Sequence, residues 1–324
     1  MFHFIPWNFS ISMSREAFQS VNVPLSVVSI LMDIFFVFCM LSQVPEQQRL
    51  KQPLNVLLGS LVGCNTALHF FTFLFVLSDF IDSLSESDSH VFYYFTAQCL
   101  LFTMRASVTS CLWLNVFYYC QIVPAQHPFL ILLKRKIRHF VYAALILDKF
   151  FFLGEFIVNV AYDRYVMSQR SSYTDRCNVT NINVICYALR TDIWLRLAYF
   201  LLSLCVMLAS SCATISYLQR HMKSMETSCR SPPHLQSQIR VTITGIVQTL
   251  LYFLCLVWLM LDHLAYNVTN ADFDSRAYII CTVLSLYSFG TEINLGFGQA
   301  VFRQQVILIW QKLLFFKFSM PSAL

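Results

Sequence analysis

Charged side chains are scarce in this chain of 324 residues. Asp, Glu, Lys and Arg make up 12% of it, whereas 57% of the residues are hydrophobic. A soluble domain usually carries roughly 25% charged residues, so a fully water-facing surface is excluded. Gly occurs only 7 times, which excludes a Gly-rich scaffold. These shortages predict packed helices whose outer surface faces lipid.

Patterns that would support chemistry at a metal or cofactor are also missing. The 12 Cys residues include no Cys-x-x-Cys pair, and the 8 His residues include no His-x-x-x-His set. We therefore expect no metal, no cofactor and no enzyme activity. A transporter or channel, the alternative from a different class, predicts repeats or Gly- and Pro-broken spans, and neither is evident. No basic segment or cleavage site precedes the first apolar run, so we expect no cleaved signal peptide.

Long apolar runs are what the chain does contain. A membrane-spanning helix needs about 20 mostly apolar residues. The runs lack the alternation of barrel strands. We predict an all-α membrane protein in which residues 1–324 form a single seven-transmembrane helix bundle. The predicted spans are roughly 19–42, 54–80, 91–122, 140–161, 190–218, 240–262 and 277–301.

The charges between the runs predict an orientation. Lys and Arg gather in alternate breaks, as in residues 49–51, 134–138 and 220–240, and in the tail from Arg303. The other breaks are acidic, as in residues 79–88 and 262–274. Basic loops stay in the cytoplasm, so we predict an extracellular N-terminus and a cytoplasmic C-terminus in the plasma membrane.

Three glycosylation sequons agree with this orientation. They begin at Asn8, Asn178 and Asn267, all on the predicted outer side. Seven helices with an outer N-terminus describe a G-protein-coupled receptor. Asp163-Arg164-Tyr165 matches the signature that ends the third span of rhodopsin-like receptors at the cytoplasmic face. Here it ends the fourth span on the outer side, so we interpret it as a chance match.

Several stretches resemble the type 2 (bitter) taste receptor family. Cys111–Tyr119 closes the third span, His127-Pro128 and Leu133–Ile137 follow it, and Leu218–Met225 closes the fifth. Two regions depart from the family: Gly63-Cys64-Asn65 stands where the second span usually has an Arg, and the seventh span lacks the usual His-Ser motif. These departures indicate a divergent member and leave a vomeronasal type 1-like pheromone receptor as the alternative.

The resemblance implies a chemosensory receptor whose partners are a small-molecule ligand, a heterotrimeric G protein and membrane lipid. The family's ligand positions fall on the third and seventh spans, at Leu100, Leu101, Met104, Cys281, Leu284 and Ser285. The G-protein side is expected to include Tyr118, Lys134, Arg135, Lys136, His221, Met225 and Arg240. The basic residues among these could equally bind lipid headgroups or only fix the topology. The sequence specifies no particular ligand, G-protein subtype or tissue.

Charged residues inside the runs are costly and are therefore functional candidates. Arg105 is a further candidate for ligand contact, or it pairs with Glu155. Arg196 is expected to extend toward the membrane surface. The roles of the other charged residues stay open, as does a disulfide between Cys99 and Cys177 or Cys186. These other residues are Asp33, Asp148, Lys149 and Glu292.

Overall fold

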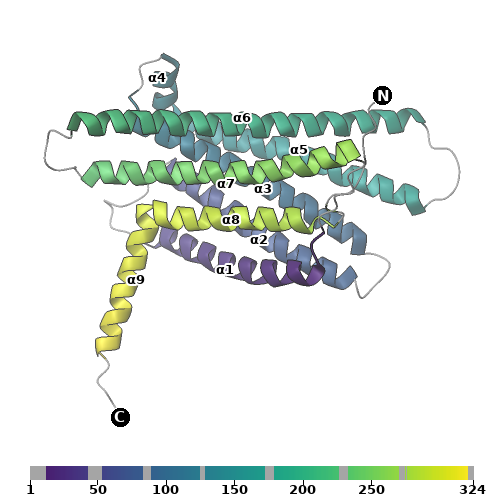
Figure 1. Cartoon of the computed structure of the whole chain (residues 1–324), viewed down its shortest axis with the longest axis horizontal. Coiled ribbons are helices and arrows are strands. Elements are labelled where there is room, and N and C mark those ends of the chain that lie inside the picture. The colour runs from purple at the N-terminus through teal and green to yellow at the C-terminus, as the bar shows by residue number, and fades with distance from the viewer. Residues whose placement is uncertain are drawn as a thin grey trace, which may run out of the picture.

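The computed structural model is nearly all helical (Figure 1). It describes residues 12–42, 53–82, 89–124, 128–171, 179–225, 233–269, 274 and 276–319. The helices within these residues are α1 (Arg15–Leu41), α2 (Leu54–Asp82), α3 (Ser89–Ile122), α4 (Pro128–Arg135), α5 (Ile137–Ser171), α6 (Val179–Met225), α7 (Pro233–Thr269), α8 (Tyr278–Gly298) and α9 (Ala300–Ser319).

The long helices lie alongside one another in one bundle, with α3 in contact with α2, α5, α6, α7 and α8 (Figure 1). The short helix α4 stands at one end of the bundle, and α9 leaves the same end at a steep angle. We call this the Lys134 end, because α4 carries Lys134 in its last turn. The opposite end, where α1 begins at Arg15 and α8 at Tyr278, is the Arg15 end.

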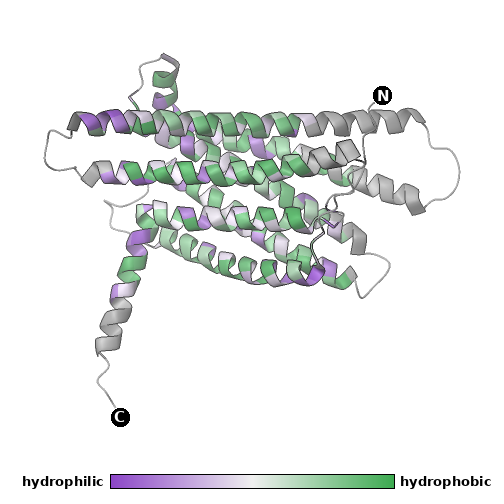
Figure 2. Cartoon of the chain, viewed as in Figure 1, coloured by the Kyte–Doolittle hydropathy of each residue, from purple (hydrophilic) through white to green (hydrophobic). Residues whose placement is uncertain are grey.

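The bundle buries polar residues within an apolar core, and its outer surface is also apolar. The buried face of α1 carries Asn22, Ser26, Ser29 and Asp33, whereas Leu31 on the other side is 61% exposed. Hydrophobic residues cover much of the bundle, and hydrophilic residues gather at the Lys134 end of α6 and at the start of α9 (Figure 2). The many exposed hydrophobic residues differ from the surface of a water-soluble protein and suit lipid as the surrounding solvent.

Six helices of the described residues are long and apolar enough to cross a membrane. They lie within α1, α2, α3, α6, α7 and α8. The prediction of an all-α chain with membrane-spanning helices is thus confirmed. The fourth predicted span corresponds to α5, which has 35 residues but is not among the six. Charged residues explain the difference, because Arg138, Asp148 and Lys149 all lie in its first half.

Several helices extend beyond the predicted spans. α6 begins at Val179 rather than near residue 190, and α5 continues to Ser171 rather than 161. The α5 extension is polar, and residues 163–165, which match the rhodopsin-like signature, lie within it. The α6 extension places Thr180, Asn181 and Asn183 among apolar residues. A search for apolar runs ends where the lipid contact ends, whereas backbone hydrogen bonding continues the helix further.

Hydroxyl side chains in the bundle commonly bond to their own helix. Thr103 donates to the carbonyl of Cys99, Ser110 to that of Ala106, and Thr249 to that of Gly245, at 2.8–2.9 Å. Each acceptor is one turn earlier along the same helix. This bonding satisfies a hydroxyl group locally, so small polar residues can be buried between helices away from water.

Candidate functional site

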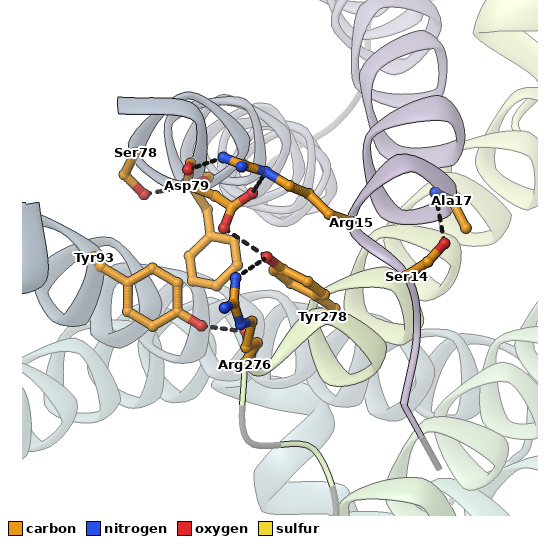
Figure 3. Close-up of polar contacts among 9 residues, drawn as sticks. Ser14, Arg15, Ala17, Ser78, Asp79, Tyr93, Arg276 and Tyr278 are labelled. Atoms are coloured by element: carbon orange, nitrogen blue, oxygen red, sulfur yellow. Dashed lines mark hydrogen bonds and ion pairs between the residues drawn. The ribbon is translucent and has the colours of Figure 1, made fainter. Parts of the chain in front are cut away.

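A polar cluster joins three helices at the Arg15 end (Figure 3). Arg15 Nε of α1 lies 2.7 Å from Asp79 Oδ2 of α2, and its Nη2 also donates to the Asp79 carbonyl. The hydroxyl of Tyr278, at the start of α8, donates to Asp79 Oδ1 at 2.6 Å. Asp79 is therefore the centre of the cluster, which we call the Asp79 clasp (Arg15, Asp79, Tyr93, Arg276 and Tyr278).

Arg276 and Tyr93 extend the clasp to α3. Arg276 Nη1 donates to the Tyr278 hydroxyl at 3.3 Å, and the Tyr93 hydroxyl donates to the Arg276 carbonyl (Figure 3). The hydrogen bond that Arg276 donates to the Tyr278 hydroxyl, together with the electrostatic effect of Tyr278, raises the pKa of Arg276 above its ordinary value. Arg276 therefore stays charged. The clasp thus holds the ends of α1, α2, α3 and α8 together.

A carboxylate caps the first turn of α8. Asp274 accepts hydrogen bonds from the backbone N–H groups of Tyr278, Ile279 and Ile280 at 2.7–3.1 Å. These N–H groups have no partner within the helix, and a negative charge at a helix N-terminus is stabilising. Ala277 enters the helix with a φ of 52°, a left-handed conformation that directs the chain from the cap into α8.

A second polar cluster is buried midway along α1, α2 and α8. Thr66 Oγ1 donates to Asp33 Oδ2 at 3.0 Å, and His69 Nε2 lies 3.0 Å from Glu292 Oε1. All three ionisable side chains are fully buried. Asp33 and Glu292 were predicted as charged residues inside spans. His69 was missed, since a single His in an apolar run gives no signal of its partner.

A cavity of about 180 Å³ lies between α3, α6, α7 and α8. Its position is nearer the Arg15 end, because it reaches Ile280 in the first turn of α8. Arg105 Cζ lies 5.9 Å from the centroid of the Phe152 ring of α5, a cation–π contact. The cavity is lined by Leu101, Met104, Arg105, Arg196, Leu197, Phe200, Leu256, Leu259, Met260 and Ile280.

The sequence of the chain matches a known family. Residues 11–313 match the model of the taste receptor protein family (TAS2R), which is nearly the whole chain. The chain belongs to this family. No curated protein matches it. The TAS2R proteins are G-protein-coupled taste receptors and not an enzyme family.

The residues expected to contact ligand divide into two groups in this taste receptor. Leu101, Met104 and Arg105 line the cavity, together with Arg196. The other four expected residues are buried and do not line the cavity: Leu100, Cys281, Leu284 and Ser285. Ser285 Oγ donates instead to Thr72 Oγ1 at 3.2 Å.

The structure also gives α6 and α7 a share in the cavity that the resemblance did not supply. Phe200 and Leu197 come from α6, and Leu256, Leu259 and Met260 from α7. A helical period in these apolar spans could have grouped these residues on one face. It could not have distinguished the face toward the cavity from the face toward lipid, because both are apolar.

The charged residues of α5 have separate environments. Asp148 is half-buried and forms a hydrogen bond with Thr109 of α3. Lys149 is exposed, and its Nζ lies 3.5 Å from Ser60 Oγ of α2. The side chain of Glu155 lies outside the described residues, so its predicted pairing with Arg105 stays a prediction.

The residues expected on the G-protein side all occur at the Lys134 end. Lys134, Arg135 and Lys136 are exposed at the junction of α4 and α5, and His221 and Arg240 are exposed on α6 and α7. Met225 ends α6, and its side chain lies outside the described residues. Tyr118 is half-buried, and its hydroxyl is 2.7 Å from Gln299 Nε2, which links α3 to the end of α8.

Other predicted features fall outside the described part of the chain. Asn8, Asn178 and Cys177 are among the residues without a described backbone, whereas Asn267 and Cys186 lie in α7 and α6 without described side chains. Cys99 is buried and has a free thiol. Within the described residues, no group of three or more His, Cys, Asp and Glu side chains is placed to hold a metal ion.

Proposed function

We propose that this chain is a bitter taste receptor of the plasma membrane that binds a small molecule in the cavity and activates a heterotrimeric G protein. The observation that carries the proposal is the cavity itself. Its lining includes Leu101, Met104 and Arg105, which the family resemblance had suggested for ligand contact. The match to the TAS2R family favours this function over a vomeronasal-type receptor.

The lining suits recognition of small, partly apolar molecules. Phe200 offers a rigid aromatic surface, and Met104 and Met260 offer flexible, polarisable side chains. Apolar walls with a few polar groups are typical of small-molecule sites. A ligand that binds more tightly to the active arrangement of α3, α6, α7 and α8 would shift the receptor toward that arrangement.

The Lys134 end suits a cytoplasmic partner. Its exposed basic residues at the α4–α5 junction meet the charge rule for cytoplasmic loops. His221 and Arg240 are exposed at the same end, on the helices that line the cavity further along. We assign this end to G-protein contact, with the Arg15 end and the N-terminus outside the cell.

We further assign the seventh membrane crossing to α5. Its length of 35 residues exceeds the roughly 20 that a crossing requires. It lies in the bundle in contact with α3 and α6 (Figure 1). Leu147 and Phe150 of α5 are 67% and 70% exposed, as a lipid-facing surface would be.

A calcium-release assay with a promiscuous G protein tests the function. Cells that display the receptor at their surface are expected to respond to members of a panel of bitter compounds. Leu101→Trp would fill part of the cavity and is expected to reduce the response roughly tenfold or more. Silence of the displayed wild-type receptor across a broad panel would contradict the proposal.

Leu31→Trp is the matched control for this assay. It makes the same substitution on the exposed side of α1, where Leu31 is 61% exposed and lies outside the cavity. We expect its response to equal that of the wild-type receptor. If both variants lost the response equally, at equal surface display, the loss would be a general effect of the added tryptophan. That result would argue against the cavity as the ligand site.

A further inference from the structure

The buried cluster of Asp33, Thr66, His69 and Glu292 contains carboxylate oxygens that its hydrogen bonds do not use. Asp33 Oδ2 accepts from Thr66, but no hydrogen bond within the described part of the chain reaches Asp33 Oδ1 or either oxygen of Glu292. His69 Nε2 lies 3.0 Å from Glu292 Oε1, close enough for an ion pair, but the two groups are not aligned as a hydrogen bond. A buried carboxylate oxygen without a partner is costly, so these oxygens indicate a further ligand.

Two serine hydroxyls beside these carboxylates are also without a partner. Ser29 lies one turn before Asp33 on α1, and Ser288 lies one turn before Glu292 on α8, so each pair shares a helix face. Both serines are fully buried, and neither hydroxyl forms a hydrogen bond among the described residues. The hydroxyls discussed under the fold bond to their own helix, whereas these two oxygens stay available to a ligand.

Helix α2 brings the two carboxylates near each other. Thr66 and His69 are on one face of α2, and each contacts one of the carboxylates. The helices that carry Asp33 and Glu292, α1 and α8, pack on one another and on α2 (Figure 1). The negative charge of Glu292 accordingly acts on Asp33. We call this oxygen-rich group the Asp33 site (Ser29, Asp33, Ser288 and Glu292).

The charges around the Asp33 site do not balance. Asp33 and Glu292 carry two negative charges when ionised, and His69 supplies one positive charge when it is protonated. Asp33 itself forms no ion pair in the described ranges of the chain. The loop that follows α1 begins after Leu41, about 12 Å further along the helix axis from Asp33. One negative charge is therefore left in the interior of the bundle.

We propose that the Asp33 site binds a monovalent cation of the size of Na⁺. Its ligands are Asp33 Oδ1, Glu292 Oε2 and the hydroxyl oxygens of Ser29 and Ser288, and water completes the coordination. Hard cations prefer such oxygen ligands. A single positive charge balances the site, whereas Ca²⁺ takes more oxygen ligands and Mg²⁺ demands near-octahedral geometry. Among the described residues no group of three or more His, Cys, Asp and Glu side chains is placed for a metal ion, which also disfavours a divalent ion.

A stripe of small polar residues leads from the Arg15 end to the site. Asn22, Ser26, Ser29 and Asp33 follow one another on the buried face of α1. Asn22 Oδ1 and Ser26 Oγ also accept no hydrogen bond in the part of the chain that the structure describes. Polar residues inside a membrane bundle commonly mark ion pathways. The proposed orientation places this entrance outside the cell, where Na⁺ is abundant. None of the four residues of the site lines the ligand cavity, so the inference goes beyond the proposed function.

Thermal unfolding of the purified full-length receptor in detergent micelles tests the inference. Tm is measured at neutral pH in NaCl and in choline chloride at equal concentration, which keeps the ionic strength equal and supplies a cation too large for the site. We expect Tm to be about 2–4 °C higher in NaCl, because an ion that binds the folded state stabilises it by mass action.

Three variants assign the effect to the site. Asp33→Asn removes the charge at nearly the same size and is expected to abolish the difference between the two salts. Ser288→Ala removes one neutral ligand and should raise the NaCl concentration that gives half of the Tm increase about fivefold. Asp148→Asn is the matched control, since it makes the same substitution at a half-buried carboxylate of α5 and should keep the full difference.

The outcomes separate a bound cation from other ways of satisfying the carboxylates. Equal Tm of the wild-type receptor in both salts would overturn the inference, because protons or buried water alone would then satisfy Asp33 and Glu292. An undiminished difference in Asp33→Asn and in Ser288→Ala would place the ion elsewhere and overturn it as well. If Asp33→Asn does not fold, the NaCl dependence of Ser288→Ala decides. No bitter compound is present, so failure here would leave the proposed function standing.

Discussion

Gly298, the last residue of α8, packs directly against Thr244 of α7. A Cβ atom at Gly298 would lie 2.2 Å from Thr244 Oγ1 and 2.9 Å from Thr244 Cβ. The second of these atoms is fixed to the backbone, so a rotamer change cannot relieve the clash. Gly298→Ala is expected to lower stability by about 1–3 kcal/mol, seen as a lower Tm of the solubilised receptor.

Gly63 in α2 provides the matched control. A Cβ atom there would meet nothing within 4 Å. Since Ala favours a helix over Gly, Gly63→Ala should leave Tm unchanged or raise stability by up to about 1 kcal/mol. Equal effects of the two substitutions would show that α7 and α8 do not approach as closely as described.

The sequence showed which charged residues lie inside spans, where a charge is costly to bury, but not which residues they contact. Arg105 was a candidate because a charge in a span demands a role, and it does line the cavity. Arg196 was expected to extend toward the membrane surface, yet it lines the same cavity. The partner of Glu292 could not be predicted, because His69 reaches it from another helix at a distance of 223 residues in sequence.

At the scale of helices, the hydrogen bonds and ion pair of the Asp79 clasp join α1, α2 and α8 at the Arg15 end. Tyr278→Phe removes the hydroxyl that donates to the buried Asp79 carboxylate at 2.6 Å. A buried acceptor that loses its donor costs about 1–3 kcal/mol, so we expect a lower Tm. Thermal unfolding of the solubilised receptor measures this effect.

Tyr217→Phe serves as the control for the clasp. Tyr217 lies on α6 with its ring 6.0 Å from the His221 ring, and its hydroxyl has no hydrogen bond within the described part of the chain. The substitution should leave Tm unchanged. If Tyr278→Phe were equally silent, the clasp would not contribute to the stability of the receptor.

The existence and order of the helices were predictable, but their connections were not. Long apolar runs located the spanning helices because lipid requires continuous apolar segments. The clasp was missed because its residues are ordinary polar residues near span ends. Arg15 precedes the first predicted span and Tyr278 lies at the start of the seventh, and only the folded chain brings them to Asp79. Polar ends of helices carry no periodic signal of which neighbour they meet.

At the scale of the whole molecule, the proposed orientation predicts where glycans can attach. Enzymatic deglycosylation of the receptor from cells is expected to lower its apparent mass, and Asn178→Gln should remove one glycan. A sequon inserted between Lys134 and Lys136 is the control and should stay unmodified. Modification of that inserted sequon, with none at Asn178, would reverse the orientation.

The overall bundle was predictable because charge asymmetry and apolar runs act along the whole chain. The exact extent of α5 and α6 was not, since the polar extension of α5 resembles a loop in composition and Thr180, Asn181 and Asn183 interrupt the apolar residues at the start of α6. Only the lining residues of α3 were predictable, because the family motif at the end of that span fixed the alignment of its ligand positions. The contributions of α6 and α7 depend on the rotation of each helix about its axis, and apolar faces on both sides leave that rotation undefined.

The local bonding of Thr103, Ser110 and Thr249 has a consequence for how the receptor can move. Donor and acceptor travel together when a helix slides or turns as a rigid body, so such motion breaks none of these bonds. Resistance to motion then comes from bonds between helices, such as that of Gln248 to Thr291 and that of Tyr118 to Gln299. A ligand that favours one arrangement of these bonds between helices can change which arrangement predominates.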